Sequence, residues 1–511
     1  MQLLKSTARV GAATIVSRIL GFVRDMVFAR YFGASAATDA FFLAFKIPNF
    51  MRRLFAEGSF SLAFVPVLSE VRASGDRAAL RDLVDHVSGT LLAVLFVVTA
   101  IGVLAAPAVL AIFAPGWLID GRPEFHLASD MLRITFPYVL LISLTALAGG
   151  ILNTFDRFLV PALTPALLNI SLILSAVLLS GRLDVPVMSL AWGVLIAGFV
   201  QLLVQVPALV RLGLLPRPRW GWRHSGVRRV LKLMVPTLIG SSVAQVNLLL
   251  DLVIATFLVS GSVSWLYYSD RLMEFPLGVF GVALSTVILP NLSRKFAGRD
   301  PQAFSHTLDW ALRLAAIITL PAALGLAALS KPILVTLFQY DAFEVSDVNM
   351  SAMSLVAYAA GLPAFIAVKV LAPGFYARQD TKTPVKIAIA SMVSNMGMNL
   401  LFVGVLVAVG FSGPHTGLAL ASSAAAYLNA GLLYRVLRKQ GVYSPEPGWG
   451  RVWLAVMLAC AAMGAALAWQ YGDLQGWVAA PAAMRATHLS GLIGFGALVY
   501  GTTLLLSLIH I

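Results

Sequence analysis

Long runs of uncharged, apolar residues recur along the whole chain, and they constrain the fold more than any other feature. Residues 87–113, 158–180, 185–210 and 387–414 contain no Asp, Glu, Lys or Arg, and each is long enough for a bilayer-spanning helix, which needs roughly 20 apolar residues. With 59% hydrophobic and only 12% charged residues, the chain is too apolar for a soluble multidomain protein. The sequence therefore predicts an all-α polytopic membrane protein.

Charges, glycines and prolines divide the chain into about fourteen such segments, following the hydropathy rule for membrane helices. We expect transmembrane helices near residues 10–32, 36–64, 87–113, 131–152, 158–180, 185–210, 232–258, 265–291, 306–330, 348–375, 386–410, 415–435, 452–471 and 489–509.

The connections between these segments differ sharply in basic residues. One alternate set, which includes the N-terminus, carries 23 Lys and Arg, whereas the opposite set carries five. Because basic loops stay in the cytoplasm, both termini are predicted to be cytoplasmic. The connection 211–232 alone holds seven basic residues, so the net charge of +14 indicates topology and contact with anionic lipid headgroups, not nucleic-acid binding.

Two sets of six predicted helices look like divergent copies of one another. Short motifs recur at offsets of 224 to 228 residues: 25–29 with 251–255, 47–48 with 275–276, and 65–69 with 289–293. Copies of six helices are parallel repeats, which in transporters form two lobes that rock around a shared cavity. We therefore expect an N-terminal lobe at 1–220, a C-terminal lobe at 221–440 and two accessory helices at 441–511.

Several basic residues lie well inside predicted helices, where they are costly. Arg18, Arg24, Lys46, Arg52 and Arg271 would each cost roughly 2.5 to 3.5 kcal/mol at mid-bilayer, on the order of 10 to 15 together. A cost of that size indicates either ion pairing within the protein or a function.

Helical spacing leaves both readings open. Internal pairs would place Arg18 near Asp25, Lys46 near Asp39 or Glu57, and Arg271 near Glu274, because these residues share helix faces. Arg24 and Arg52, in contrast, have no acid on their own face, since adjacent residues such as Arg24 and Asp25 diverge by about 100 degrees. Arginines from helices 1, 2 and 8 that face a common space between the lobes would select an anion, and the guanidinium fork suits phosphate.

The N-terminal residues resemble one known family. The motifs that carry the resemblance are Ser17-Arg18-Ile-Leu-Gly21-Phe22-Val-Arg24-Asp25, Thr38-Asp39-Ala40-Phe41, Ile47-Pro48-Asn49, Arg52-Arg53-Leu54-Phe55-Ala56-Glu57-Gly58-Ser59, Phe64-Val65-Pro66 and Trp265 to Pro276. They are similar to the signature of the MurJ/MviN family of lipid II flippases, within the multidrug/oligosaccharidyl-lipid/polysaccharide exporter superfamily.

The resemblance implies a transporter of the bacterial inner membrane that serves peptidoglycan biosynthesis, cell wall biogenesis and cell shape. It carries lipid II, an undecaprenyl-diphosphate-linked precursor, from the inner to the outer leaflet by alternating access. The resemblance assigns substrate binding to Arg18, Arg24, Arg52, Arg271 and Asp39, and it places the lipid tail in a groove led by the two accessory helices. Four residues close in sequence to the predicted substrate-binding residues are further candidates to line the cavity: Asp25, Asn49, Glu57 and Glu274.

The return of such a transporter to its inward-facing state needs an energy source. The sequence has no Gly-rich phosphate loop ending in Gly-Lys-Ser/Thr, so ATP hydrolysis by this chain is not expected, and no cofactor is predicted. A coupling cation or the membrane potential remains. Oxygen atoms of Asp251, Asn395 and Asn399 would suit a small cation, although Asp251 near a helix end could equally pair with a basic residue.

Two other functions fit the sequence less well. A flippase for another polyprenyl-diphosphate-linked glycan is disfavoured only by the long N-terminal signature. A related exporter of cationic drugs would be expected to line its cavity with acids and aromatics, whereas this cavity is predicted to be rich in arginine. A membrane enzyme acting on polyprenyl diphosphates would need paired acids with Mg²⁺, or a nucleophile with a base. Asp270 and Glu274 share a face, but Arg271 lies beside them, so we expect no enzyme.

Overall fold

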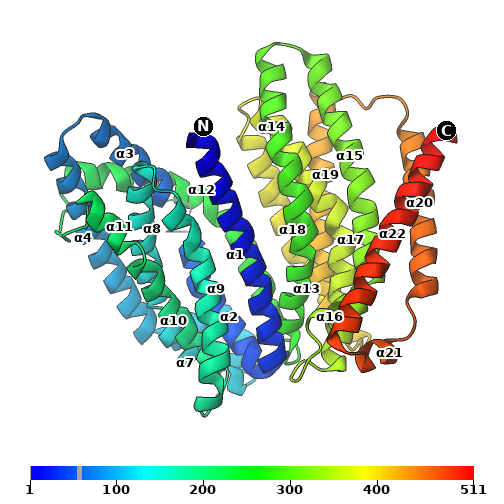
Figure 1. Cartoon of the computed structure of the whole chain (residues 1–511), viewed down its shortest axis with the longest axis horizontal. Helices are drawn as coiled ribbons and strands as arrows, with labels where there is room; N and C mark the ends of the chain where they lie inside the picture. Colours follow the sequence, from blue (N-terminus) through cyan, green and yellow to red (C-terminus); the bar gives the residue numbers. More distant parts are fainter. Residues whose placement is uncertain (1, 54–59, 511) are drawn as a thin grey trace. The chain divides into compact units, whose positions relative to one another are not determined.

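The computed structural model describes residues 2–53 and 60–510, with side chains for 11–53, 60–235, 249–281 and 283–507. Every regular element in these residues is helical (Figure 1), which confirms the predicted all-α class. The chain divides into two compact units, Met1–Val263 and Ser264–Ile511. The three-part division predicted from the sequence stays a prediction.

The first unit is built from α1 to α12. Its helices are α1 (Gln2–Phe32), α2 (Ala36–Met51), α3 (Ser61–Ala73), α4 (Arg77–Leu104), α5 (Ala106–Phe113), α6 (Pro115–Ile119), α7 (Pro123–Thr135), α8 (Tyr138–Thr154), α9 (Leu159–Leu179), the short η2 (Ser180–Arg182), α10 (Met188–Leu203), α11 (Val206–Leu212) and α12 (Ser225–Ala255).

Helix packing in the first unit places α1 along α9 and α2 along α7, while α10 packs against both α8 and α9 (Figure 1). Small residues permit close approach, as is common between membrane helices: a Cβ at Gly198 of α10 would lie 2.8 Å from Leu141 of α8. One buried core joins Leu68 of α3, Leu83 of α4, Ile151 of α8 and Val227 of α12. The start of α12 is therefore held by the first unit.

The second unit contains most of α13 and all later helices. These are α13 (Ser262–Pro276), the π-helical η3 (Leu277–Gly281), α14 (Val282–Ala297), α15 (Pro301–Ala328), α16 (Ser330–Leu337), α17 (Val345–Tyr376), α18 (Lys382–Ala408), α19 (Thr416–Lys439), α20 (Trp449–Gln470), α21 (Leu474–Ala479) and α22 (Ala482–His510).

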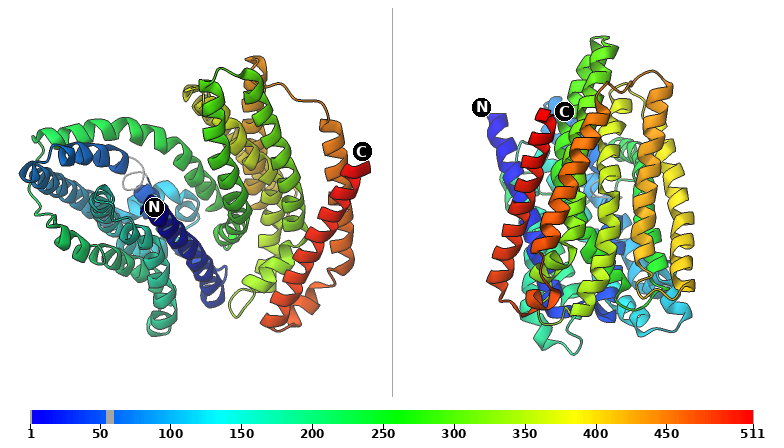
Figure 2. Two further views of the ribbon diagram at one scale, coloured as in Figure 1. Left: turned by 45° about the horizontal axis from the view of Figure 1, so that its top comes forward. Right: turned by 90° about the vertical axis from the view of Figure 1, so that its right-hand side faces the viewer.

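Helix α17 is the centre of the second unit, where it packs against α14, α15 and α19. Leu308 of α15, Leu362 and Phe375 of α17, and Leu437 of α19 belong to one buried core. The last two long helices, α20 and α22, run side by side (Figures 1 and 2), and α20 also packs along α15. They coincide with the predicted accessory pair.

In the described residues, eleven helical stretches are long and apolar enough to cross a membrane, and they correspond to predicted spans 3 to 6 and 8 to 14. The other three predicted spans fall on α1, α2 and α12. Helix α1 carries Arg18, Arg24 and Asp25 within two turns of one another, and α2 ends at Met51. The predicted count of fourteen stays a prediction.

Candidate functional site

Arg24 lies in α1, and polar groups enclose its guanidinium. Nη2 lies 2.6 Å from Asp25 Oδ1, Nε donates to the same oxygen at 3.0 Å, and Nη1 donates to Asn169 Oδ1 at 3.0 Å. The ring of Phe28, one turn further along the helix, lies 5.5 Å from the guanidinium carbon. Since Arg24 is 5% and Asp25 1% exposed, this is a buried, charge-compensated cluster.

The prediction that Arg24 lacks an acidic partner is wrong. Side chains of adjacent helical residues do leave the helix in different directions, but the arginine side chain is long, and its planar fork carries five donors. It therefore reaches back to the carboxylate beside it. Arg18, which shares a helix face with Asp25, has an exposed side chain.

Asn169 of α9 is the partner that the sequence analysis did not identify. Its Nδ2 donates to the backbone oxygen of Ser17 at 3.0 Å, while its Oδ1 accepts from Arg24. One amide thus joins α9 to α1 at two points. The available signal was a single strongly polar residue in the middle of the uncharged run 158–180, because polar residues within membrane helices usually have a partner.

Arg52 immediately follows α2 and is half-buried. Its Nε and Nη2 both donate to Asn49 Oδ1, at 3.0 and 2.8 Å, as residues three apart on one helix face can. This contact orients the guanidinium. Glu57, a further candidate for the cavity, lies outside the described residues.

Asp39 occupies the first turn of α2, behind the N-cap Ser35, and is 2% exposed. Its Oδ2 accepts the backbone N–H of Gly261 at 2.7 Å. Gly261 has a φ of +95°, a conformation that favours glycine, and it belongs to the turn that follows α12. Glu124 accepts from Ser260 in the same turn at 2.5 Å, so two buried carboxylates hold it.

Arg271 lies in α13 and has different surroundings. Its Nη1 lies 3.0 Å from Glu274 Oε2, and the guanidinium carbon lies 5.3 Å from the ring of Tyr267. The side chains of Arg271 and Glu274 are 36% and 48% exposed. The predicted internal pair is therefore present, but it is open to solvent.

The residues of the predicted cation site have the following settings. Asp251 is half-buried on α12, in the first unit. Asn395 and Asn399 lie one turn apart on α18, both at most 2% exposed. In the described part of the chain, the buried Oδ1 of Asn395 has no hydrogen-bond partner.

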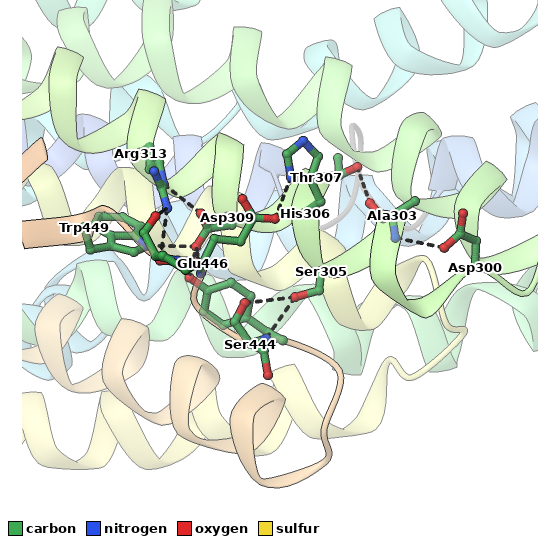
Figure 3. Close-up of polar contacts among 12 residues, drawn as sticks. Asp300, Ala303, Ser305, His306, Thr307, Asp309, Arg313, Ser444, Glu446 and Trp449 are labelled. Atoms are coloured by element: carbon green, nitrogen blue, oxygen red, sulfur yellow. Dashed lines mark hydrogen bonds and ion pairs between the residues drawn. The ribbon is translucent and has the colours of Figure 1, made fainter. Parts of the chain in front are cut away.

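Asp309 of α15 is a buried carboxylate with several hydrogen-bond donors, and the sequence analysis also missed it (Figure 3). Oδ1 accepts from Tyr443 Oη at 2.7 Å and from Trp449 Nε1 at 2.8 Å, and Oδ2 accepts from Arg313 Nε at 2.7 Å. Burial, reinforced by the Asp309 carboxylate, raises the pKa of Tyr443 above its ordinary value. Asp309 thereby fastens the connection between α19 and α20 to α15.

The described contacts thus separate three roles. Arg24 is part of a buried network, Arg52 and Arg271 carry guanidinium groups that are at least partly accessible, and Asp309 is structural. Accessible guanidinium groups can bind the phosphates of an amphiphile.

Comparison with known sequences gives a consistent result. The sequence model of a family described as "Lipid II flippase MurJ" matches residues 28–485. A "Probable lipid II flippase MurJ" from Vibrio cholerae is 50% identical over 99% of this chain and 96% of its own length. A "Lipid II flippase MurJ" from Burkholderia cenocepacia is 42% identical over 98% of this chain and 97% of its own length.

Solved structures agree with the sequence comparisons. "Lipid II flippase MurJ, inward closed conformation" superposes with a TM-score of 0.79 at 27% identity, covering 97% of both chains. An inward-facing multidrug resistance transporter of the MATE family superposes with a TM-score of 0.68 at 14% identity, covering 86% of this chain and 98% of its own. The second likeness is one of fold alone.

Proposed function

The chain belongs to the MurJ family of lipid II flippases, and on that basis we propose that it carries lipid II from the inner to the outer leaflet of the bacterial cytoplasmic membrane. The observation that supports this most strongly is the family match over residues 28–485, together with 50% identity to a relative over 99% of the chain. The protein is a multi-pass membrane transporter and not an enzyme. Its role lies in peptidoglycan biosynthesis.

The proposed orientation places both termini in the cytoplasm. It is supported by the bias of 23 basic residues against five in alternate connections, because basic loops are retained on the cytoplasmic side. The same connections contact anionic lipid headgroups.

In the proposed mechanism, Arg18, Arg24, Arg52 and Arg271 provide the positive charge for the diphosphate and headgroup of the substrate. Arg52 and Arg271 are the better suited to direct contact, since Arg52 is only half-buried and Arg271 is 36% exposed, whereas Arg24 is buried. Arg24 is paired with Asp25 and therefore binds an anion only if the substrate competes with that carboxylate. The accessory helices α20 and α22 hold the undecaprenyl tail.

Alternating access completes the cycle. Asp39, whose carboxylate accepts the N–H of Gly261, is proposed to compete with the substrate for an arginine when the protein faces outward, which promotes release. Return to the inward state is driven by a coupling cation or by the membrane potential. The buried oxygen of Asn395 and the carboxylate of Asp251 are the residues to test first for cation dependence.

Complementation tests the proposal directly. A strain depleted of its own lipid II flippase would receive wild type, Arg52→Ala, Arg271→Ala or the control Arg133→Ala, all at matched membrane levels. Arg133 is exposed and pairs with Asp130 at 2.7 Å, so its loss removes a surface pair of the same kind. Wild type and the control should restore growth and cell shape, and the other two variants should fail.

Each other outcome has a distinct meaning. If wild type inserts but does not rescue, the substrate is not lipid II, and another polyprenyl-diphosphate-linked glycan is the next candidate. If Arg52→Ala and Arg271→Ala both rescue, these arginines do not bind the substrate.

A further inference from the structure

Two histidines and one aspartate meet at the start of α4, away from the residues assigned to transport. Asp82 and His86 are four residues apart on α4, and His224 immediately precedes α12. One ligand atom from each of the three lies within 4.8 Å of the other two, and all three residues are half-buried. The imidazole rings stack with their centroids 4.7 Å apart and an interplanar angle of 9°.

The segment that carries His224 is held tightly against α4. The buried carboxylate of Asp85 accepts a hydrogen bond from the backbone N–H of Arg217 at 2.8 Å. The backbone oxygen of Asp85 accepts one from the backbone N–H of Arg219 at 2.9 Å. Further along, Thr90 Oγ1 accepts from the N–H of Gly221 at 3.1 Å. These hydrogen bonds do not involve the histidines, and Gly221 lets the segment approach closely, because a Cβ there would lie 2.7 Å from the ring of His86.

Both imidazole rings direct a nitrogen towards Asp82. His86 Nδ1 lies 2.8 Å from the backbone oxygen of Asp82 and 3.2 Å from its Oδ1, while His224 Nε2 lies 3.1 Å from Oδ2. His224 Nδ1 accepts the N–H of Gly226, which caps α12. Because Nδ1 is an acceptor, the proton of a neutral His224 is on Nε2 and points at the carboxylate.

From this arrangement we infer that Asp82, His86 and His224 form a binding site for a divalent transition-metal ion of the zinc type. Two imidazole nitrogens and one carboxylate oxygen are a ligand set that such ions favour, whereas Mg²⁺ and Ca²⁺ favour oxygen alone. An ion there replaces the ring protons that now face Asp82. The proton of His224 moves to Nδ1, at the cost of the capping bond from Gly226, and the proton of His86 moves from Nδ1 to Nε2.

An ion bound by these three residues would have room for further ligands, because a cavity lies beside the cluster. A cavity of about 640 Å³ is lined by His86, His224, Trp220, Trp222 and Arg223, together with Gly221. Three protein ligands leave at least one position for water or an anion, and Arg223 favours an anion. Bound metal would cross-link α4 to the connection 213–224, which carries three of the seven basic residues of 211–232.

Metal titration of the full-length, untagged protein tests this inference independently of lipid II transport. Protein stripped with a chelator would be titrated with Zn²⁺ against a chromophoric competitor, and with Co²⁺, whose visible absorption distinguishes four- or five-coordinate nitrogen and oxygen sites from octahedral aqua ions. His224→Asn removes a ligand but keeps a good capping side chain. His86→Ala removes the other ring, and His126→Asn is an exposed control.

We expect one Zn²⁺ per wild-type chain, and an affinity at least about 100-fold lower in His224→Asn and in His86→Ala, since even second-shell substitutions cost 10- to 100-fold. His126→Asn should bind like wild type. Equal binding by wild type and by a variant that combines His86→Ala with His224→Asn would overturn the site, because the zinc would then lie elsewhere. If Co²⁺ added to wild type kept the spectrum of the octahedral aqua ion, the site would also be overturned. This result does not depend on whether any variant folds.

Discussion

Arg24 in the first unit and Arg271 in the second are predicted for the same task, yet their surroundings are opposite. Arg24 is 5% exposed and bonded to both a buried carboxylate and a buried amide. Arg271 is 36% exposed, and its partner Glu274 is 48% exposed. One guanidinium is part of the packing of its unit, whereas the other lies at the surface of its unit.

This difference separates two consequences of removing an arginine. Deleting one member of a buried ion pair leaves the other charge desolvated and is strongly destabilising. Deleting one member of an exposed pair costs little stability. Loss of transport in an Arg24 variant can therefore arise from misfolding, whereas loss of transport in an Arg271 variant reports function more directly.

Arg24→Ala should have the largest effect on stability. It leaves the carboxylate of Asp25 and the oxygen of Asn169 buried without their guanidinium, at a cost of about 3 to 5 kcal/mol. Unfolding in mixed micelles with increasing SDS would measure this cost. A normal unfolding midpoint combined with failed complementation would contradict the structural reading and make Arg24 a direct ligand of the substrate.

Asp309→Ala tests whether the second unit also depends on a buried charge, but at another position. The substitution removes the acceptor for Tyr443, Trp449 and Arg313. We expect the free energy of unfolding to fall by about 3 kcal/mol. This is the lower end of the range for buried pairs, because Arg313 keeps two backbone acceptors. Proteolysis of the connection 440–448 should accelerate as well. Unchanged cleavage would show that the network does not fasten this connection.

Asn169→Leu isolates the neutral part of the Arg24 cluster. The amide donates to Ser17 and accepts from Arg24, so its removal should cost about 1 to 3 kcal/mol, the usual range for an unsatisfied buried group. The SDS unfolding midpoint measures it. A double-substitution cycle with Arg24→Ala should show that the two losses are not additive, and strict additivity would mean that the amide and the guanidinium act independently.

Arg271→Ala is expected to leave stability nearly unchanged, with a loss below about 1 kcal/mol for an exposed pair. Complementation should nevertheless fail. Glu274→Gln provides the matched control, because it breaks the same ion pair but keeps the guanidinium. Failure of both variants would indicate that the pair, and not the arginine alone, is required.

The all-helical class and most spans followed from hydropathy, because a membrane helix must be apolar over most of its length. The partners of the charged residues were harder to predict. The Asn49 contact of Arg52 follows from spacing within one helix, but Asn169 reaches Arg24 across 145 residues, and Asp309 meets Trp449 across 140. Such contacts depend on which helices are neighbours, and helical periodicity alone does not specify that.

The smallest effect on stability is expected for an exposed ion pair in the first unit. Glu70 of α3 and Arg229 of α12 lie 2.7 Å apart, with side chains 61% and 55% exposed. The hydrogen bond from Arg229 lowers the pKa of Glu70 below its ordinary value of 4.5. The unfolded state therefore binds more protons just below pH 4.5. The pair stabilises the fold above that pH, and this stabilisation is lost as the pH falls through the folded-state pKa.

Glu70→Gln should lower the melting temperature at neutral pH by less than about 1 °C, and the difference should vanish in acid. A difference that persists unchanged in acid would mean that Glu70 contributes through packing and not through its charge.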